Sequence, residues 1–420
     1  MTAPRTRHAI VAATATALTL SACGADGSGD GGQEVTLWMY PVIADQAASK
    51  EFWDTAEADF EKANPDVDLA IELQTFDKRD AQISAALAAG SGPDLVLITP
   101  DQAATYHAIG GLLPVDDAVA DIRDAFYPAA LDSATIEDEL FGVPIFQNVF
   151  TTAYNTAIFE DAGLALPRTW DDLRAAAPEL AKEGIAVMDY AGSPEQTLNL
   201  SFYPFLWQAG GHVFTDDGAD VAFDSPEGAE ALQLLVDLQQ EGALPPDAAT
   251  DGPAVEGAPI ARGEAAMRAT TSLTEYGQLQ AAVGDDSAAL GQPLTGAEQV
   301  TYGNAGLLSL TSINDESNRQ AAYDVLAFMS TPDFQESLNA AAGNLPTRTD
   351  VAVDDSDPAV ASMAEALELA YPGEPSPASR QVMAALAPKI QAALRGDMSA
   401  EEALAAAAEE SRQILANTQP

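Results

Sequence analysis

The sequence predicts an α/β protein of two domains. Short apolar strands alternate with amphipathic helices along the first hundred mature residues, an order typical of a parallel sheet with right-handed crossovers. About 390 residues follow an N-terminal export segment, which is more than one hydrophobic core usually holds. Apolar residues make up 47% of the chain, which indicates a globular protein.

The clearest pattern is strand–helix–strand–helix–strand. Apolar residues at 35–39, alternating apolar residues at 67–73 and a continuous apolar run at 94–98 predict three strands. Helical spacing predicts helices at 49–62 and 77–89 between them. This order favours a parallel sheet.

A second α/β region begins near residue 149. Thr169 and Asp172 form a capping-box pattern that opens a helix, and Ser225 followed by Pro226 opens another. We expect further strands at 149–154, 185–188, 263–271 and 306–311, a hairpin turn at 216–218, a surface loop at 245–259, and helices at 198–208, 318–329, 332–341, 357–370, 378–395 and 399–417.

The N-terminus has the pattern of a cleavable export signal. Arg5 and Arg7 precede an uncharged apolar run at 9–20, which is too short to span a bilayer. The run ends in Leu-Ser-Ala-Cys at 20–23, which resembles the lipobox of bacterial lipoproteins. Cys23 is the only cysteine, and a Gly-rich polar tether follows it. These features predict a mature chain that begins at an acylated Cys23 and is anchored outside the cell membrane.

The chain is strongly acidic. It contains 18 Lys and Arg against 65 Asp and Glu, and loss of Arg5 and Arg7 with the signal takes the formal net charge from −47 to −49. This charge repels nucleic acid and anionic lipid surfaces, so we expect neither as a partner and contact with the membrane only through the lipid.

Signatures of catalysis are absent from the sequence. There is no G-x-S-x-G, phosphate-binding loop or H-E-x-x-H pattern. His107 and His212 are the two histidines outside the signal, and both are expected to be structural or surface residues. The many carboxylates give no specific glycosidase pair. The sequence therefore predicts a protein that is not an enzyme and uses no cofactor or metal.

Aromatic and polar side chains gather near predicted strand ends and in loops. In open α/β sheets, ligands bind beyond the carboxyl ends of the strands. Aromatic faces suit the C–H faces of sugar rings, and Asp, Asn and Gln can hydrogen-bond sugar hydroxyls. The candidate residues are Trp38, Tyr40, Asp101, Gln102, Gln147, Asn148, Phe202, Tyr203, Trp207, Tyr276, Tyr302 and Asn304.

An ordered set of segments carries a resemblance to a known family. The segments are VTLWMYP (35–41), FEKANPDVDLAIEL (60–73), AALAAGSGPDLVLITPD (85–101), GGLLPVDD (110–117), FGVPIFQNVFTTAYN (141–155), LPRTWDDL (166–173), WQAGGHVF (207–214), ARGEAAMRA (261–269), GLLSLTS (306–312) and GNLPTR (343–348). In this order they resemble bacterial extracellular solute-binding proteins of family 1, which include sugar receptors of ABC importers.

The resemblance implies a two-lobed periplasmic-binding-protein fold of type II-like form, each lobe a mainly parallel sheet flanked by helices. Residues 34–145 plus 264–312 would form lobe one, and 146–263 plus 313–420 would form lobe two. Hinge crossovers would lie near 143–147, 262–266 and 311–315. The lobes would close on a solute held between them.

The resemblance also bears on the site. It supports Tyr40, Asp101, Gln102, Gln147, Asn148, Phe202, Tyr203 and Asn304, and adds Thr271 and Arg380. Ile98 stands where the maltose-binding member has a stacking aromatic, which disfavours maltose as solute. Few basic residues are expected near the cleft, which disfavours phosphorylated sugars.

The function implied is a monomeric, lipid-anchored receptor that delivers a neutral mono- to trisaccharide to an ABC permease. Two alternatives remain. A receptor for polyamines or another cationic solute would use the abundant acids, and an exported carbohydrate-active enzyme would need a catalytic carboxylate pair.

Overall fold

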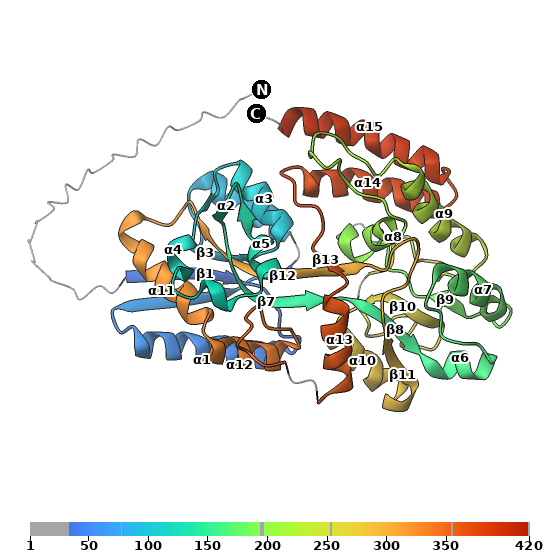
Figure 1. Cartoon of the computed structure of the whole chain (residues 1–420), viewed down its shortest axis with the longest axis horizontal. Helices are drawn as coiled ribbons and strands as arrows, with labels where there is room; N and C mark the ends of the chain where they lie inside the picture. The colour runs from blue at the N-terminus through green and yellow to red at the C-terminus, as the bar shows by residue number, and fades with distance from the viewer. Residues whose placement is uncertain (1–32, 77, 194–196, 253, 354–355, 419–420) are drawn as a thin grey trace, which may run out of the picture.

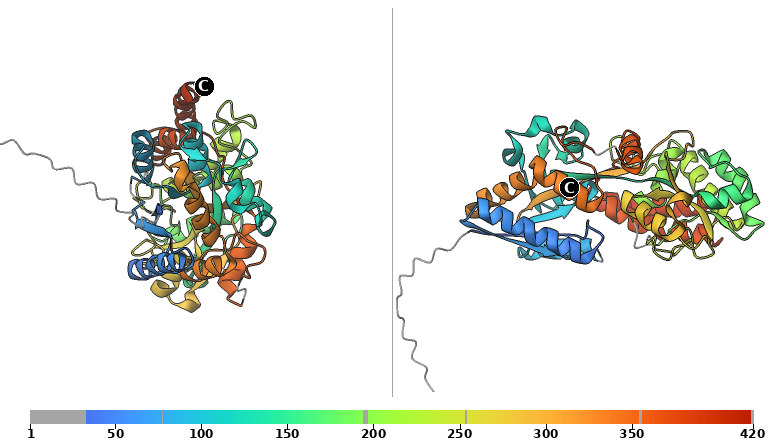
Figure 2. Two further views of the ribbon diagram at one scale, coloured as in Figure 1. Left: turned by 90° about the vertical axis from the view of Figure 1, so that its left-hand side faces the viewer. Right: turned by 90° about the horizontal axis from the view of Figure 1, so that it is seen from below.

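The computed structural model describes residues 33–418, apart from 77, 194–196, 253 and 354–355. The predicted signal, Cys23 and the tether up to residue 32 lie outside the described residues. Two α/β lobes lie side by side, and strands β7 (Val143–Val149) and β12 (Thr301–Thr311) run between them (Figure 1). In the view from below, the two lobes lie end to end along the longest axis of the molecule (Figure 2, right).

The larger sheet forms the centre of lobe one. Its strands besides β7 and β12 are β1 (Gln33–Met39), β2 (Val67–Leu73), β3 (Leu95–Ile98), β4 (Leu112–Leu113) and β13 (Ala370–Tyr371). The order is β13-β12-β3-β1-β2, with β4 and β7 also on β12. β1 is parallel to β2 and β3, as predicted, whereas β12 is antiparallel to β3, β4 and β7.

The smaller sheet forms the centre of lobe two. Its strands are β8 (Thr151–Asn155), β9 (Ala186–Met188), β10 (Ala265–Thr271) and β11 (Ala288–Gly291), in the order β11-β8-β10-β9. β10 is parallel to β9, and β8 is antiparallel to both β10 and β11. The sheet of lobe two is therefore mixed, because the chain returns to it from several directions.

Helices surround both sheets (Figure 1). Those of lobe one are α1 (Gln46–Ala63), α2 (Arg79–Ala89), α3 (Pro100–Ala108), α4 (Asp116–Val119), α5 (Pro128–Asp132), α11 (Arg319–Met329) and α12 (Pro332–Ala342). Those of lobe two are α6 (Thr156–Ala162), α7 (Trp170–Ala181), α8 (Tyr203–Gln208), α9 (Pro226–Gln240), α10 (Leu273–Val283), α14 (Ser379–Leu394) and α15 (Ala400–Thr418), and α13 (Pro358–Leu367) packs beside β7 and β11. No helix of the described segments has both the length and the apolar character of a membrane span.

The division of the chain between the lobes differs from the predicted one. β10 and β11 pair with β8 in lobe two, although 264–312 was assigned to lobe one. Conversely, α11 and α12 pack Val325, Leu326 and Leu338 into the core of lobe one, although 313–420 was assigned to lobe two. Periodicity identifies a strand or an apolar helix face, but it does not identify the sheet that the element joins.

The crossovers are shifted accordingly. The chain passes from β7 of the larger sheet to β8 of the smaller sheet at Phe150, close to the first predicted crossover. It returns along β12, where Tyr302 belongs to the core of lobe two and Leu307 to that of lobe one. It leaves lobe one again after the segment 347–349, which is still hydrogen-bonded to residues 125–127 of that lobe. The predicted crossovers at 262–266 and 311–315 are therefore corrected.

Local sequence signals agree better with the structure. Thr169 and Asp172 form the predicted capping box of α7, and the Ser225 hydroxyl accepts the Gly228 N–H at the start of α9. The helix predicted at 198–208 is interrupted, with a 3₁₀ turn before α8. The segment 245–259 is irregular but not simply a surface loop, since several of its apolar side chains are buried in lobe two.

Gly228 provides a test of close packing in lobe two. A Cβ at this position would lie 1.9 Å from the backbone oxygen of Phe223, which cannot rotate away. We therefore expect Gly228→Ala to lower the free energy of unfolding by at least ~3 kcal/mol, measured by urea denaturation.

The matched control is Gly277→Ala in α10. A Cβ there meets nothing within 4 Å, so the change should raise the free energy of unfolding by ~0.5–1 kcal/mol. Equal effects of the two substitutions would contradict the packing described for α9.

Candidate functional site in the interlobe cleft

The carboxyl ends of β1, β2 and β3 face lobe two, where parallel α/β sheets commonly bind ligands. Two groups of side chains lie there. The first, the charged cluster, consists of Arg79, Asp80, Asp101 and Arg380. The second group lines a cavity beside β7, one of the two strands that run between the lobes.

The charged cluster contains an ion pair between the lobes. Arg380, on α14 of lobe two, places Nε 2.8 Å from Asp101 Oδ2 and 3.7 Å from Asp80 Oδ2, both in lobe one. A second guanidinium nitrogen of Arg380 donates to the Thr99 hydroxyl at 3.2 Å. The side chain of Asp101 is 6% exposed and that of Arg380 is 22% exposed, so the pair is largely screened from water.

Lobe one holds the two carboxylates in place. The Gln102 amide donates to Asp80, and its oxygen accepts the Thr99 N–H at 3.0 Å. The Thr99 hydroxyl donates to Asp101 at 2.5 Å. Asp101 and Gln102 lie in the first turn of α3, so the chain direction after β3 aims both side chains toward the cleft.

Arg79 completes the charged cluster. Its guanidinium carbon lies 5.2 Å from the ring centroid of Tyr40 and 5.4 Å from that of Phe76. The two rings are themselves stacked, with centroids 5.5 Å apart. Within the described residues, Arg79 has no ion-pair partner within 4 Å, and it is held by the rings.

Burial and charge set the protonation states here. Burial raises the pKa of Tyr40 to about 12, and burial also raises the pKa values of Tyr203 and Tyr302. Burial lowers the pKa of Arg79, and the nearby Arg380 lowers it further. Burial opposes the charge of Arg380 too, but Asp101 and Asp80 outweigh it and raise its pKa. All three phenols are therefore hydroxyl donors at neutral pH, and the hydroxyls of Tyr40 and Tyr203 are buried without a hydrogen-bond partner among the described residues.

A cluster of aromatic rings in lobe two lies close enough to Arg380 for its charge to act on Tyr203 and Tyr302. Trp207 contacts Tyr203, Tyr302 and Tyr371, with ring centroids 4.9–6.4 Å apart. Glu374 accepts the indole N–H of Trp207 at 3.1 Å and the Val213 N–H at 2.8 Å. This packing fixes the loop before α14 and thereby the position of Arg380.

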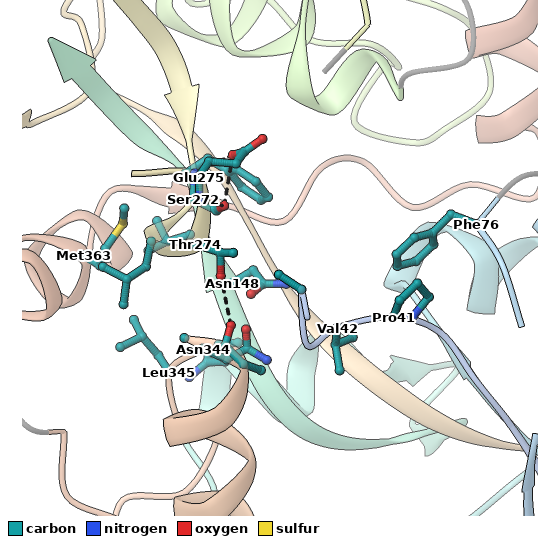
Figure 3. A pocket seen from close by; sticks show the side chains of 17 residues that line it. Pro41, Val42, Phe76, Asn148, Ser272, Thr274, Glu275, Asn344, Leu345 and Met363 are labelled. Atoms are coloured by element: carbon teal, nitrogen blue, oxygen red, sulfur yellow. Dashed lines mark hydrogen bonds between the residues drawn. The ribbon is translucent and has the colours of Figure 1, made fainter. Parts of the chain in front are cut away.

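The cavity has a volume of ≈ 330 Å³ and lies between the lobes. Pro41, Val42 and Phe76 lie on its lobe-one side, Ser272, Thr274 and Glu275 lie opposite, and Asn148 lies between (Figure 3). Figure 3 also shows Asn344, Leu345 and Met363 on its wall. The buried Asn344 Nδ2 has no hydrogen-bond partner among the described residues.

The structure brings together some of the predicted site residues. Tyr40, Asp101, Gln102 and Arg380 lie in or against the charged cluster, and the charges of Asp101 and Arg380 act on Tyr203 and Tyr302. Gln147 and Asn148 line the cavity, where the Gln147 amide already donates to the Pro346 oxygen at 2.7 Å.

Other predicted residues lie elsewhere or are covered. Trp38 and Tyr276 line neither group: Trp38 donates to Glu72, and Tyr276 donates to the Ala288 oxygen inside lobe two. Phe202 is a core residue with no exposed surface, and Trp207 is 3% exposed. Thr271 is buried at the end of β10, and Asn304 lies opposite Asn148 in the β7–β12 ladder. His107 packs on Phe141, and His212 lies 3.4 Å from Glu374.

Five residues that line the cleft were not among the predicted site residues: Phe76, Arg79, Asp80, Thr274 and Asn344. The first three follow β2, so the strand-end rule used for Tyr40 and Asp101 also applies to them. Two basic residues, Arg79 and Arg380, lie in the cleft among the described residues, and Asp80 and Asp101 balance their charge.

Comparisons with known proteins agree with this architecture. Residues 40–336 match the model of the family described as bacterial extracellular solute-binding protein. The arabinooligosaccharide-binding protein of Halalkalibacterium halodurans is 27% identical over 215 residues, which are 50% of this chain and 46% of that protein. The chain thus matches about half the length of this relative.

Solved structures match over nearly the whole chain. An ABC transporter solute-binding protein from Thermotoga lettingae, bound to α-D-tagatose, superposes with a TM-score of 0.79 at 26% identity, covering 91% of this chain and 100% of that one. The cyclic α-maltosyl-1,6-maltose-binding protein of Arthrobacter globiformis gives a TM-score of 0.74 at 25% identity, covering 92% and 100%.

The family match covers well over half of the chain, and the two-lobed fold with polar and aromatic side chains in its cleft fits it. The chain therefore belongs to the bacterial extracellular solute-binding protein family.

Proposed function

We propose that the protein is a lipid-anchored receptor that captures a neutral carbohydrate of one to three sugar units and delivers it to an ABC import permease. The observation that carries the proposal is the interlobe cleft, which combines aromatic faces with charged and amide hydrogen-bonding groups from both lobes. Such a combination suits sugar rings, which have C–H faces and hydroxyl edges.

The relatives support a sugar as the solute. The Halalkalibacterium protein is named for an arabinooligosaccharide, the Thermotoga protein holds α-D-tagatose, and the Arthrobacter protein is named for a cyclic maltosyl-maltose. The cavity of ≈ 330 Å³ is near the lower end of the ~300–1,000 Å³ typical of small-molecule sites, which favours a small saccharide.

The charge balance of the cluster argues against a cationic solute. Asp101 and Asp80 already face Arg380, and Arg79 lies nearby. A polyamine would have to displace a guanidinium that is fixed by Thr99 and Asp101, and would then approach the remaining one. A neutral solute meets no such cost.

The exported-enzyme alternative receives less support from the same residues. Asp80 and Asp101 are held by Arg380, Gln102 and Thr99. A glycosidase needs two carboxylates that are both free to act on the substrate, whereas both carboxylates here are already engaged by side chains of the protein.

A calorimetric titration tests the proposed function. We expect the purified chain from residue 24 onward to bind at least one member of a panel of D-glucose, D-galactose, L-arabinose, D-tagatose and their di- and trisaccharides. Spermidine and putrescine should give no binding. Binding of the polyamines and silence across the sugars would contradict the proposal.

Arg380 should matter for solute affinity. Arg380→Ala leaves Asp101 without its guanidinium and separates the two sides of the cleft, so we expect at least ~10-fold weaker sugar binding by calorimetry. Arg412→Ala is the matched control, because Arg412 pairs with Asp220 and Asp224 on lobe two at 2.8–2.9 Å and should leave affinity unchanged. Equal affinities of both variants and the wild type would contradict a role for Arg380.

The anchor can be tested separately from binding. We expect Cys23→Ala to move the protein from the membrane fraction into the medium of the expressing cells, detected by immunoblot, because the acylated thiol is lost. Sugar affinity should stay at the wild-type value. Retention of the variant on the membrane would contradict the lipid anchor.

A further inference from the structure

Phe76 is an exposed aromatic residue at the mouth of the cleft. Its side chain is 52% exposed, and the other large apolar residues that are comparably exposed among the described ones are Leu73, Ile109 and Tyr127. Single exposed apolar residues are common on proteins and need no explanation by themselves. Phe76 differs from those three because it also lines the interlobe cavity.

The ring of Phe76 is held in place from one side. Tyr40 stacks on it at 5.5 Å with an interplanar angle of 19°. The guanidinium of Arg79 lies 5.4 Å from the Phe76 centroid and is shared with the Tyr40 ring. A ring fixed in this way loses little further freedom when a ligand covers its exposed surface, which lowers the entropic cost of binding.

The opposite wall offers hydrogen bonds. Ser272, Thr274 and Glu275 face Phe76 across the cavity, with Asn148 between (Figure 3). Thr274 already donates to the Ala342 oxygen at 3.1 Å, and Glu275 accepts from Ser272 at 2.9 Å. Asn344 Nδ2 is buried with no partner among the described residues, so it is a donor left for a ligand.

We propose that Phe76 is the stacking platform of this receptor and that the apolar face of one sugar ring rests on it. The hydroxyl edge of the same ring then accepts from Asn344 and lies beside Asn148. This inference rests on the proposed function, since it assigns a place to the carbohydrate. It also explains how the site can lack an aromatic residue at Ile98, because Phe76 supplies the aromatic face from beyond the end of β2, two strands away from β3 in the sheet.

The platform restricts the class of solute. A ring can lie flat on Phe76 only if several C–H bonds point to the same side, as in aldopyranoses of the gluco or galacto type. Acyclic polyols and sugars with axial hydroxyls on both faces present no such surface. Sugars of the first kind should therefore bind more tightly than D-mannitol.

Affinity measurements on variants test the platform. We expect Phe76→Ala to weaken binding of the tightest sugar of the calorimetric panel by ~10-fold or more, and Phe76→Tyr to stay within ~3-fold of the wild type. Leu73→Ala is the matched control. Leu73 is the last residue of β2, three residues before Phe76, and it is 40% exposed but does not line the cavity, so affinity should not change. Circular dichroism melting curves show whether each variant is folded.

Fluorescence gives a second reading. In Phe76→Trp, the added indole should change its emission when the sugar binds, whereas in Leu73→Trp it should not. Wild-type affinity in Phe76→Ala, or an unchanged emission in Phe76→Trp under saturating sugar, would overturn the platform while leaving the proposed function intact. Absence of sugar binding by the wild type would overturn the proposed function and the platform with it.

Discussion

The ion pair between Arg380 and Asp101 is the contact on which the cleft depends. The pair joins α14 of lobe two to α3 of lobe one. No β-strand hydrogen bonds connect these two helices, so side chains make the contact. A largely buried ion pair costs desolvation and becomes favourable only when further hydrogen bonds satisfy both groups. Thr99 supplies such bonds on the lobe-one side, because its hydroxyl donates to Asp101 and accepts from Arg380. In lobe two, Glu374 fixes the loop before α14 through its bonds to Trp207 and Val213. This polar contact across the cleft adds to the covalent connection that strands β7 and β12 make between the lobes.

The charge of the cleft differs from that of the whole chain. The mature chain is expected to carry −49, yet the charged cluster contains two arginines and two aspartates and is locally neutral. A surface of this charge attracts cations at long range, but the paired carboxylates inside offer them little. Under the proposed function, the acidic exterior and the cleft have separate roles: the exterior would keep the protein solvated, and the cleft would select its solute by shape, aromatic faces and hydrogen bonds.

Much of the fold could be predicted from local signals. β1, β2 and β3 have the apolar runs that the sequence indicated, and the caps at Thr169 and Ser225 act as their side-chain chemistry predicts. The assignment of elements to lobes could not be predicted, because β10 pairs with strands far away in sequence and its own residues specify only a strand. In the site, Asp101 follows from the strand-end rule, whereas its pairing with Arg380 depends on the approach of two lobes. Phe76 and Arg79 lie a few residues beyond the end of β2, where the strand-end rule places them near the cleft, but their stacking with Tyr40 depends on the fold and could not be predicted.

The proposed function and the stacking role of Phe76 both require that a neutral saccharide occupy the space between the lobes. Native mass spectrometry of the protein purified gently from its own cells tests this most directly, because the mass of a co-purified solute is read without choosing a panel. We expect a bound mass that corresponds to one to three sugar units and is released as a neutral molecule on denaturation. A bound mass that matches a polyamine or another cationic amine would contradict it.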